Sequence, residues 1–201
     1  MSMRPVITVL LLAQLLALLL AVADESWAAS ACRPGDEVRI WTAPLVARPG
    51  ERLEVVAVAT DGDLTDLQVT NPAGRRTELS VARGGGPPWS LRAALPKAVR
   101  GSYRIEARRA GQVVACTEVA VGGGAGNRGS GEWDLANQAL YAAWVEHLFD
   151  APPEQSLSFP SLEPVLHNPE RNVLYDYLSK GEDSRVTAEP DCADLSYFLR
   201  A

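Results

Sequence analysis

Cysteine, basic charge and long apolar runs are scarce in this sequence. Only 3 of the 201 residues are cysteines, which excludes a dense disulfide scaffold. The formal net charge of −6 excludes a globally basic nucleic-acid binder. After the N-terminal segment, no stretch is long and apolar enough to span a membrane. The chain is 47% hydrophobic and 22% charged, a balance typical of a folded globular protein.

The N-terminal segment has the layout of an export signal. Arg4 precedes an apolar run from Val6 to Ala23, and small residues occupy positions 28–31. This order predicts a signal peptide over residues 1–31, cleaved close to Cys32. Two alternatives stay open. The run is long enough to remain as an uncleaved anchor, and Ala-Ser-Ala-Cys partly matches a lipoprotein box. We expect a bacterial protein in the periplasm or on the cell surface, where disulfides persist.

Charge divides the remaining chain into two parts. Residues 32–121 carry 13 basic and 10 acidic side chains, whereas residues 132–201 carry 4 and 13. Between them, residues 122–131 read GGGAGNRGSG, a composition typical of a flexible linker. We therefore expect two separate domains joined by this linker.

The first part has the periodicity of short strands separated by turn signals. We predict strands at residues 37–43, 53–60, 67–70, 76–81, 90–94, 102–108 and 112–121. This spacing predicts an all-β antiparallel sandwich, and the continuous apolar run at 53–60 predicts a central strand. The sequence from residue 94 to 121 resembles the last hairpin of Ig-like sandwiches in bacterial surface proteins, in which a Gly-x-Tyr opens the penultimate strand. Gly101 and Tyr103 hold those places.

Two cysteines and two tryptophans belong to this predicted sandwich. Cys32 precedes the first strand and Cys116 lies within the last. We predict that they form a disulfide, which would stabilise the domain by roughly 4–4.5 kcal/mol through closure of a long loop. The alternative is that Cys116 is a small buried hydrophobe. Trp41 and Trp89 are expected in the core or at the edge of the sandwich.

The second part is rich in helical patterns. We predict three helices: residues 132–149, residues 169–180 with Asn168 as N-cap, and a third that begins at Asp191. Residues 155–164 are expected to form a loop. Three helices without strands make an incomplete core. We therefore expect this segment to be the start of an α+β domain in a longer protein, and the 201 residues alone to be inactive.

The third cysteine follows the N-cap of the last predicted helix. The positive end of a helix dipole stabilises a thiolate, which suits a nucleophile. Asp191-Cys192-Ala193-Asp194 resembles the nucleophile helix of NlpC/P60-type, papain-like cysteine peptidases, whose motif is Asp-Cys-Ser-Gly. Ala193 and Asp194 stand where that family has Ser and Gly. The resemblance implies that Cys192 is the nucleophile, and that a histidine base and a third polar residue lie on strands after this helix.

Other roles stay open for Cys192 and for the two histidines. The acidic neighbours Asp191 and Asp194 would raise the pKa of the thiol, and the helical spacing also fits an inert buried thiol or a disulfide to another chain. His147 falls in the last turn of the first predicted helix, where a cation or a polar ring is favoured beside the carbonyl ends. His167 just precedes the second and is expected at the surface. We expect neither to be the base.

The leading hypothesis is an exported cell-envelope protein that carries the N-terminal part of a cysteine hydrolase. It would cleave cell-wall peptide or other amide bonds by acyl transfer through Cys192. The alternative is a non-enzymatic envelope binding or scaffold protein with an Ig-like module. We expect peptidoglycan or another envelope protein as partner and no nucleic acid. Membrane contact is expected only through the N-terminal segment, and no cofactor or metal is expected.

Overall fold

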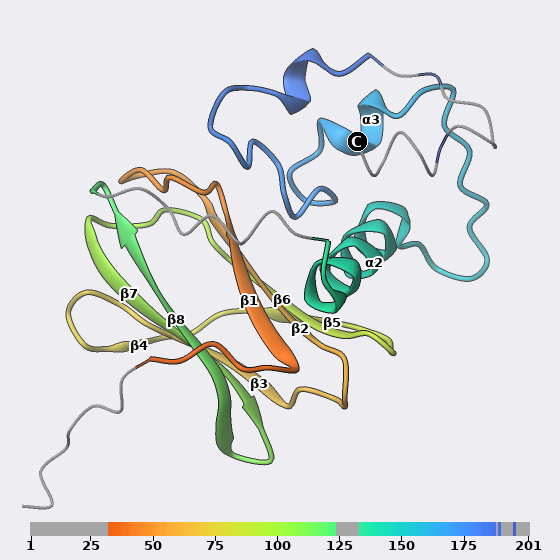
Figure 1. Cartoon of the computed structure of the whole chain (residues 1–201). Coiled ribbons are helices and arrows are strands. Elements are labelled where there is room, and N and C mark those ends of the chain that lie inside the picture. Colours follow the sequence, from red (N-terminus) through yellow and green to blue (C-terminus); the bar gives the residue numbers. More distant parts are fainter. Residues whose placement is uncertain (1–31, 124–132, 188, 190–194, 196–201) are drawn as a thin grey trace, which may run out of the picture. The chain divides into compact units, whose positions relative to one another are not determined.

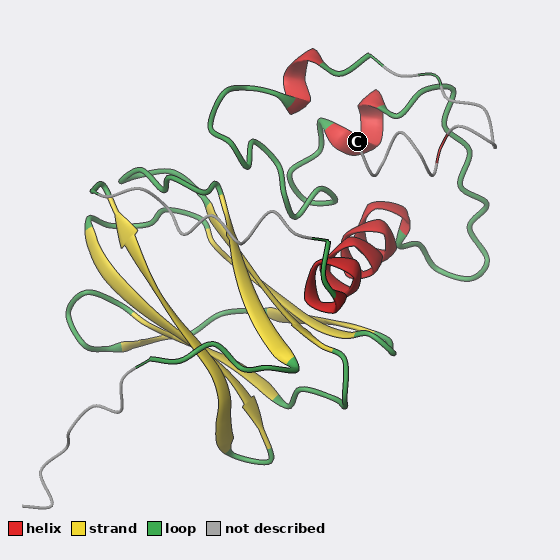
Figure 2. Cartoon of the chain, in the orientation of Figure 1, coloured by secondary structure: helices red, strands yellow, loops and turns green. Residues whose placement is uncertain are grey.

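The computed structural model describes residues 32–123, 133–187, 189 and 195. The predicted signal peptide and most of the predicted linker lie outside these residues. The described part is mostly antiparallel β-structure, as Figures 1 and 2 show. The strands are β1 (Val38–Ala43), β2 (Leu53–Ala59), β3 (Asp66–Thr70), β4 (Arg76–Thr77), β5 (Val81–Gly84), β6 (Trp89–Leu95), β7 (Gly101–Arg109) and β8 (Gln112–Val121). The predicted β-rich fold is confirmed, but the single strand predicted at 76–81 is wrong, because β4 and β5 are separate strands that belong to different sheets.

The strands form two four-stranded sheets that share one core. The first sheet has the order β1-β2-β6-β5, and the second has the order β4-β3-β7-β8. Val55 and Leu91 from the first sheet, and Val69 and Ile105 from the second, are fully buried in one aliphatic cluster. Every neighbouring pair of strands is antiparallel. Alternation of apolar and polar residues along β3 and β7 therefore corresponds to an inner and an outer face.

Strand β2 is buried along its whole length because both of its faces are covered. Val55 and Ala57 point into the core shared by the two sheets. Val56 and Val58 point the other way, into a cluster with helix α2 (Leu135–Phe149). The continuous apolar sequence of β2 follows from this double burial, and its prediction as a central strand is confirmed.

The disulfide between Cys32 and Cys116 is confirmed. Their Cα atoms lie 5.0 Å apart across 84 residues of sequence. The N–H of Cys116 also donates to the carbonyl of Arg33 at 2.9 Å, so the short segment of residues 32–35 lies along the edge of β8. A Cβ at Gly35 would lie 2.6 Å from the carbonyl oxygen of Val114, which explains the glycine at this close approach. The segment covers an edge strand that would otherwise expose unpaired backbone groups.

Residues 133–187, which we call the helical segment, contain one of the two helices predicted there, together with two short helical turns that were not predicted. Helix α2 is present, and the side chain of Asp134 caps it by accepting from the N–H of Asn137. A short helix α3 (Glu163–Leu166) begins inside the predicted loop, and η1 (Asp183–Arg185) is a single 3-10 turn.

The predicted helix over residues 169–180 is wrong. Its N-cap forms as expected, since the Asn168 side chain accepts from the N–H of Glu170 at 2.9 Å. The chain then continues as turns, and Asp176 and Ser179 adopt positive φ. Such residues cannot extend a right-handed helix. Of the predicted third helix only Leu195 is described, and its backbone is helical.

Candidate functional site

The predicted nucleophile, Cys192, lies outside the described residues. The first described residue after Cys192 is Leu195, which is partly buried. Leu195 packs on a cluster formed by α2, α3 and the residue before α3. The fully or nearly fully buried members of this α2–α3 cluster are Leu148, Leu162, Val165 and Leu166. Leu195, three residues after Cys192, is therefore in contact with the helical segment.

His147 faces the first sheet rather than solvent. It is 9% exposed, and its Nε2 atom has no hydrogen-bond partner within the described structure. Burial lowers the pKa of His147, and the positive charge of Arg92 lowers it further, against the opposing influence of Glu146, Asp150 and Glu54. The lowered pKa disfavours the cationic form, so of the two forms expected in the last turn of α2, a cation or a polar ring, His147 is the buried polar ring. Ala139, Ala143 and His147 line the buried side of α2 at intervals of four residues.

His167 lies at the surface, as the sequence predicts. It follows α3, and its Nε2 atom is 3.2 Å from the carbonyl oxygen of Val186. The adjacent Leu166 belongs to the α2–α3 cluster on which Leu195 packs. His167 is thus the histidine that solvent reaches, while His147 is enclosed.

A group of charged side chains joins the first sheet to the helical segment. Glu54 on β2 is 4% exposed and accepts from Arg52 at 2.5 Å and from Arg92 at 3.2 Å. Arg92 also donates hydrogen bonds to the backbone carbonyls of Pro169 and Glu170. Arg52 also forms two hydrogen bonds with the Glu170 carboxylate, at 2.8 and 3.2 Å. The negative charge of Glu54 is therefore compensated by two arginines, which a buried carboxylate requires.

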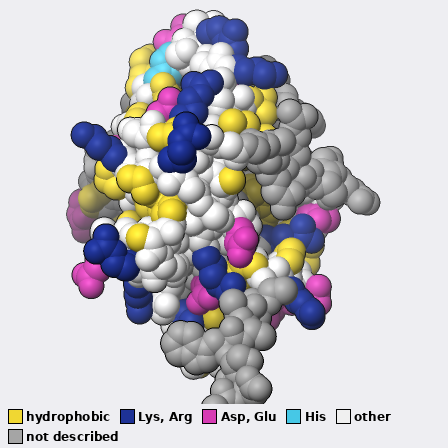
Figure 3. Space-filling model, turned by 90° about the vertical axis from the view of Figure 1, so that its left-hand side faces the viewer, with side chains coloured by type: hydrophobic (Ala, Val, Ile, Leu, Met, Phe, Trp, Pro, Cys, Tyr) yellow, Lys and Arg dark blue, Asp and Glu magenta, His cyan; other side chains and the backbone are white. Residues whose placement is uncertain are grey.

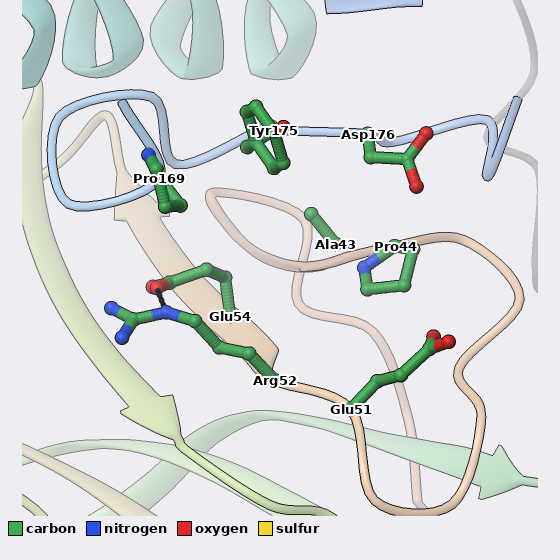
Figure 4. Close-up of a pocket in the computed structure, with 8 residues that line it drawn as sticks. All are labelled: Ala43, Pro44, Glu51, Arg52, Glu54, Pro169, Tyr175 and Asp176. Atoms are coloured by element: carbon green, nitrogen blue, oxygen red, sulfur yellow. Dashed lines mark hydrogen bonds and ion pairs between the residues drawn. The ribbon is translucent and has the colours of Figure 1, made fainter. Parts of the chain in front are cut away.

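A pocket of about 260 Å³ lies beside this charged group. In Figure 4, Arg52 and Glu54 stand on one side of the pocket and the carboxylates of Glu51 and Asp176 on the other. The volume is below the roughly 300–1,000 Å³ typical of small-molecule sites. Arg52 and Glu54 are already paired with each other. We therefore interpret the pocket as a gap between two packed regions and not as a substrate cleft.

Asn172 is the polar centre of the helical segment. It is fully buried, and its oxygen accepts from the Trp144 indole at 2.9 Å and from the N–H of Leu174 at 3.1 Å. Its amide nitrogen donates to the carbonyl of Leu166 at 3.0 Å and to the Asp183 carboxylate at 2.8 Å. One side chain thus ties α2, α3 and η1 together. All the donors and acceptors of a buried amide find partners here, as burial demands.

Carboxylates also fix the turns around residues 176–183. Asp183 accepts from the N–H of Asp176 at 2.6 Å. Burial raises the pKa of Asp183 despite the hydrogen bonds from Asp176 and Asn172 that oppose the rise. For Glu182, burial acts to raise the pKa, but hydrogen bonds from the N–H groups of Leu178 and Lys180 outweigh it and the pKa is lowered. These acidic side chains satisfy backbone donors that a helix would have used.

The sequence analysis missed the charged group and the Asn172 centre. Glu54 lies within an apolar strand run, and a lone carboxylate in such a run signals a buried partner. Asn172 carries no comparable signal, because asparagine is common in surface turns. Among the described residues, the structure brings no histidine, cysteine or carboxylate together as a nucleophile and base.

Comparisons with known proteins and searches for ion or membrane sites add no further assignment. No protein-family model matches this chain, and no curated protein matches it. Within the described part, no group of three or more His, Cys, Asp or Glu residues could hold a metal ion. None of the described helices has the length and apolar character needed to cross a bilayer.

Proposed function

We propose that this chain is an exported cell-envelope protein that carries the N-terminal part of a cysteine hydrolase, with Cys192 as the nucleophile. The observation that carries export is the Cys32–Cys116 disulfide, because such bonds persist in oxidising compartments outside the cytosol. The N-terminal layout of charge, apolar run and small residues supports the same conclusion. The proposed location is the periplasm or the cell surface of a bacterium.

The proposal treats the two sheets as an Ig-like sandwich. Their strand orders, β1-β2-β6-β5 and β4-β3-β7-β8, match the A-B-E-D and C′-C-F-G orders of immunoglobulin folds. Tyr103, near the start of β7, accepts a hydrogen bond at its hydroxyl from the N–H of Val99 at 2.8 Å. A tyrosine bonded to the backbone a few residues upstream is the tyrosine corner of such sandwiches.

The proposed chemistry is acyl transfer. The thiolate of Cys192 attacks an amide carbonyl, the C–N bond breaks, the amine leaves with a proton, and water then hydrolyses the thioester. The Asp191-Cys192 sequence supports this role through its likeness to the NlpC/P60 nucleophile helix. The buried His147 is unsuited to act as base. The remaining candidates for the catalytic base are His167, within these 201 residues, and a histidine that follows the nucleophile in the sequence. The second order is that of the NlpC/P60 family. The proposed substrate is a peptidoglycan peptide or another amide.

A thiol-reactive probe tests the nucleophile directly. The protein, exported by its own cells, is treated with iodoacetamide at pH 6 to 9, and labelling is read by mass spectrometry. We expect Cys192 to react with an apparent pKa below the usual thiol value of about 8.5, and Cys192→Ser to abolish amide hydrolysis of cell-wall peptides. The matched Cys32→Ser/Cys116→Ser variant removes the other two cysteines and should keep the labelling. An unreactive Cys192 in the exported protein would refute the hydrolase proposal.

The second proposal is a non-enzymatic envelope binding or scaffold protein. The compensated charges around Glu54 favour it, because each of these groups already serves the contact between sheet and helical segment. Under this proposal the Cys192→Ser variant binds peptidoglycan or its envelope partner as the wild type does. Loss of this binding in the Cys192→Ser variant would contradict the second proposal.

A further inference from the structure

Three loops at one end of the first sheet are joined by backbone hydrogen bonds. The loop between β1 and β2 meets the loop between β6 and β7 where the N–H of Gly50 donates to Ala98 at 2.7 Å. It meets the turns around residue 177 where the N–H of Leu45 donates to the carbonyl of Tyr177, also at 2.7 Å. The Ser179 hydroxyl lies 3.4 Å from the Val46 carbonyl oxygen. Side chains at the tips of these loops therefore share one surface region.

Aliphatic side chains are exposed on all three loops. Val46, Val99 and Leu178 are 41%, 58% and 48% exposed. Their neighbours Leu45 and Ala98 are buried and fill the core, so the exposed residues are not needed for that packing. Single exposed aliphatic residues are ordinary, but three on adjoining loops form an apolar patch that calls for a partner.

Basic side chains surround these aliphatic residues. Lys97 and Lys180 are the two lysines of the chain, and both are exposed on these loops, as are Arg48 and Arg100. Three acidic side chains lie nearby: Glu51, which pairs with Arg48 at 3.6 Å; Asp176, which accepts from the N–H of Gly181 at 2.6 Å; and Glu182, which accepts from the N–H groups of Leu178 and Lys180. In Figure 3, dark blue Lys and Arg side chains alternate with yellow hydrophobic ones on the face turned to the viewer.

We propose that this loop patch docks on the surface of an anionic lipid bilayer. The patch is defined by Val46, Arg48, Lys97, Val99, Arg100, Leu178 and Lys180. Aliphatic tips on loops enter the boundary between headgroups and acyl chains, while basic side chains contact the anionic headgroups. The four basic side chains of the patch outnumber the three nearby carboxylates, in contrast to the net charge of −6 for the chain, so the complementary surface is anionic. This membrane contact is additional to the one expected from the N-terminal segment, and it does not depend on Cys192.

Vesicle binding tests the proposal with the protein that starts at Cys32 and keeps its disulfide. Two kinds of vesicle are compared. One contains phosphatidylcholine with about 30% of the anionic lipid phosphatidylglycerol, and the other contains phosphatidylcholine alone. We expect co-sedimentation with the anionic vesicles, weakening as salt rises from low to physiological strength. Binding to the neutral vesicles should be at least about 25-fold weaker, which is what two basic contacts contribute at roughly fivefold each.

Two pairs of matched variants separate the apolar from the basic contribution. Val99→Ser/Leu178→Ser should weaken binding about tenfold, whereas Val113→Ser/Leu135→Ser, at equally exposed positions outside the patch, should leave it unchanged. Lys97→Gln/Lys180→Gln should weaken binding about 25-fold, at roughly fivefold for each charge.

The control for charge is Arg33→Gln/Arg75→Gln, which changes two exposed arginines outside the patch. Thermal unfolding of every variant shows that the fold is retained. Absence of binding to anionic vesicles overturns the proposal. So does binding that depends on the lysines but not on Val99 and Leu178, because that result indicates adsorption by charge alone, without entry of the aliphatic side chains into the bilayer. Equal losses in the patch variants and their matched controls would also overturn it.

Discussion

The two sheets and the helical segment use polar residues in opposite ways. The core between the sheets is aliphatic apart from Tyr103, and the strands are held by their own backbone ladders. In the helical segment, by contrast, a buried asparagine and a set of carboxylates satisfy the backbone. A sheet needs only alternation to bury one face, whereas a chain of turns needs particular side chains to satisfy its backbone. The helical segment therefore depends on individual residues more than the sheets do.

The contact between these regions is also asymmetric. The first sheet already has a core on its inner face, so α2 covers a second face that adds to existing burial. For the helical segment, the same contact supplies a large share of its buried surface through Ala139, Ala143 and Val173. We expect the sheets to survive damage to the helical segment better than the reverse.

The largest predicted effect on stability concerns the Cys32–Cys116 disulfide. Replacing Cys32 and Cys116 by serine, in a Cys192→Ser background to prevent thiol exchange, should lower the free energy of unfolding by about 4.5 kcal/mol. The cause is the 84-residue separation that the disulfide spans. Urea unfolding measures it against the single Cys192→Ser variant. A decrease in the free energy of unfolding below about 1 kcal/mol would show that the strand ladders alone hold residues 32–35 on β8.

The next effect tests the charged group between the two regions. Arg92→Met should cost about 3 kcal/mol, because it removes a partner of the buried Glu54 and two donors to the turn at Pro169. Arg109→Met is the matched control. Its pair with Asp61 is about one third exposed on each side, so it should cost no more than about 1 kcal/mol. Equal costs in urea unfolding would contradict the claim that Arg92 joins sheet and helical segment.

A smaller effect is expected at the centre of the helical segment. Asn172→Ala leaves the Trp144 indole and the Leu166 carbonyl without their partners, at a cost of about 2 kcal/mol. Hydrogen exchange should show lost protection in α2 and unchanged protection in β7. Asn71→Ala is the control, because its side chain caps only an exposed turn at Ala73 and Arg75. A uniform loss of protection in both regions would break the comparison.

The smallest effect is a pH dependence of stability from His147. Its pKa is lowered in the folded state by burial, so as pH falls below about 6.5 the unfolded chain binds the proton first. Stability is then lost by up to about 1.4 kcal/mol per pH unit until the folded-state pKa is reached, and is fully present above pH 6.5. His147→Gln should remove this slope, whereas the exposed His167→Gln should retain it. A slope that persists in His147→Gln would assign it to other groups.

The strands could be predicted from the sequence because their pattern is local. The alternation of Tyr103, Ile105 and Ala107 with polar residues is enough to place β7, and the double burial of β2 is visible as an apolar run interrupted only by Glu54. The disulfide followed from the positions of two cysteines around one predicted domain. None of these inferences needed the arrangement of distant side chains.

The errors in the helical segment come from distant contacts. Asn168 caps a turn as predicted, but Asn172 is drawn to Trp144 and Asp183, which lie far from it in sequence. The chain therefore turns where propensity favours a helix. His147 shows the same limit, since its place in the last turn of α2 fits either a cation or a polar ring, and only the packing of α2 on the sheet buries it.

Native-state hydrogen exchange in increasing urea tests the central claim most directly: the helical segment depends on the sheets more than they depend on it. In the wild-type protein, the amides of α2 should open through a partial unfolding at lower urea than those of β2 and β7. The strand amides should open only with global unfolding. If α2 and the strands exchange through one common opening at all urea concentrations, the two regions are a single cooperative unit and the claim is contradicted.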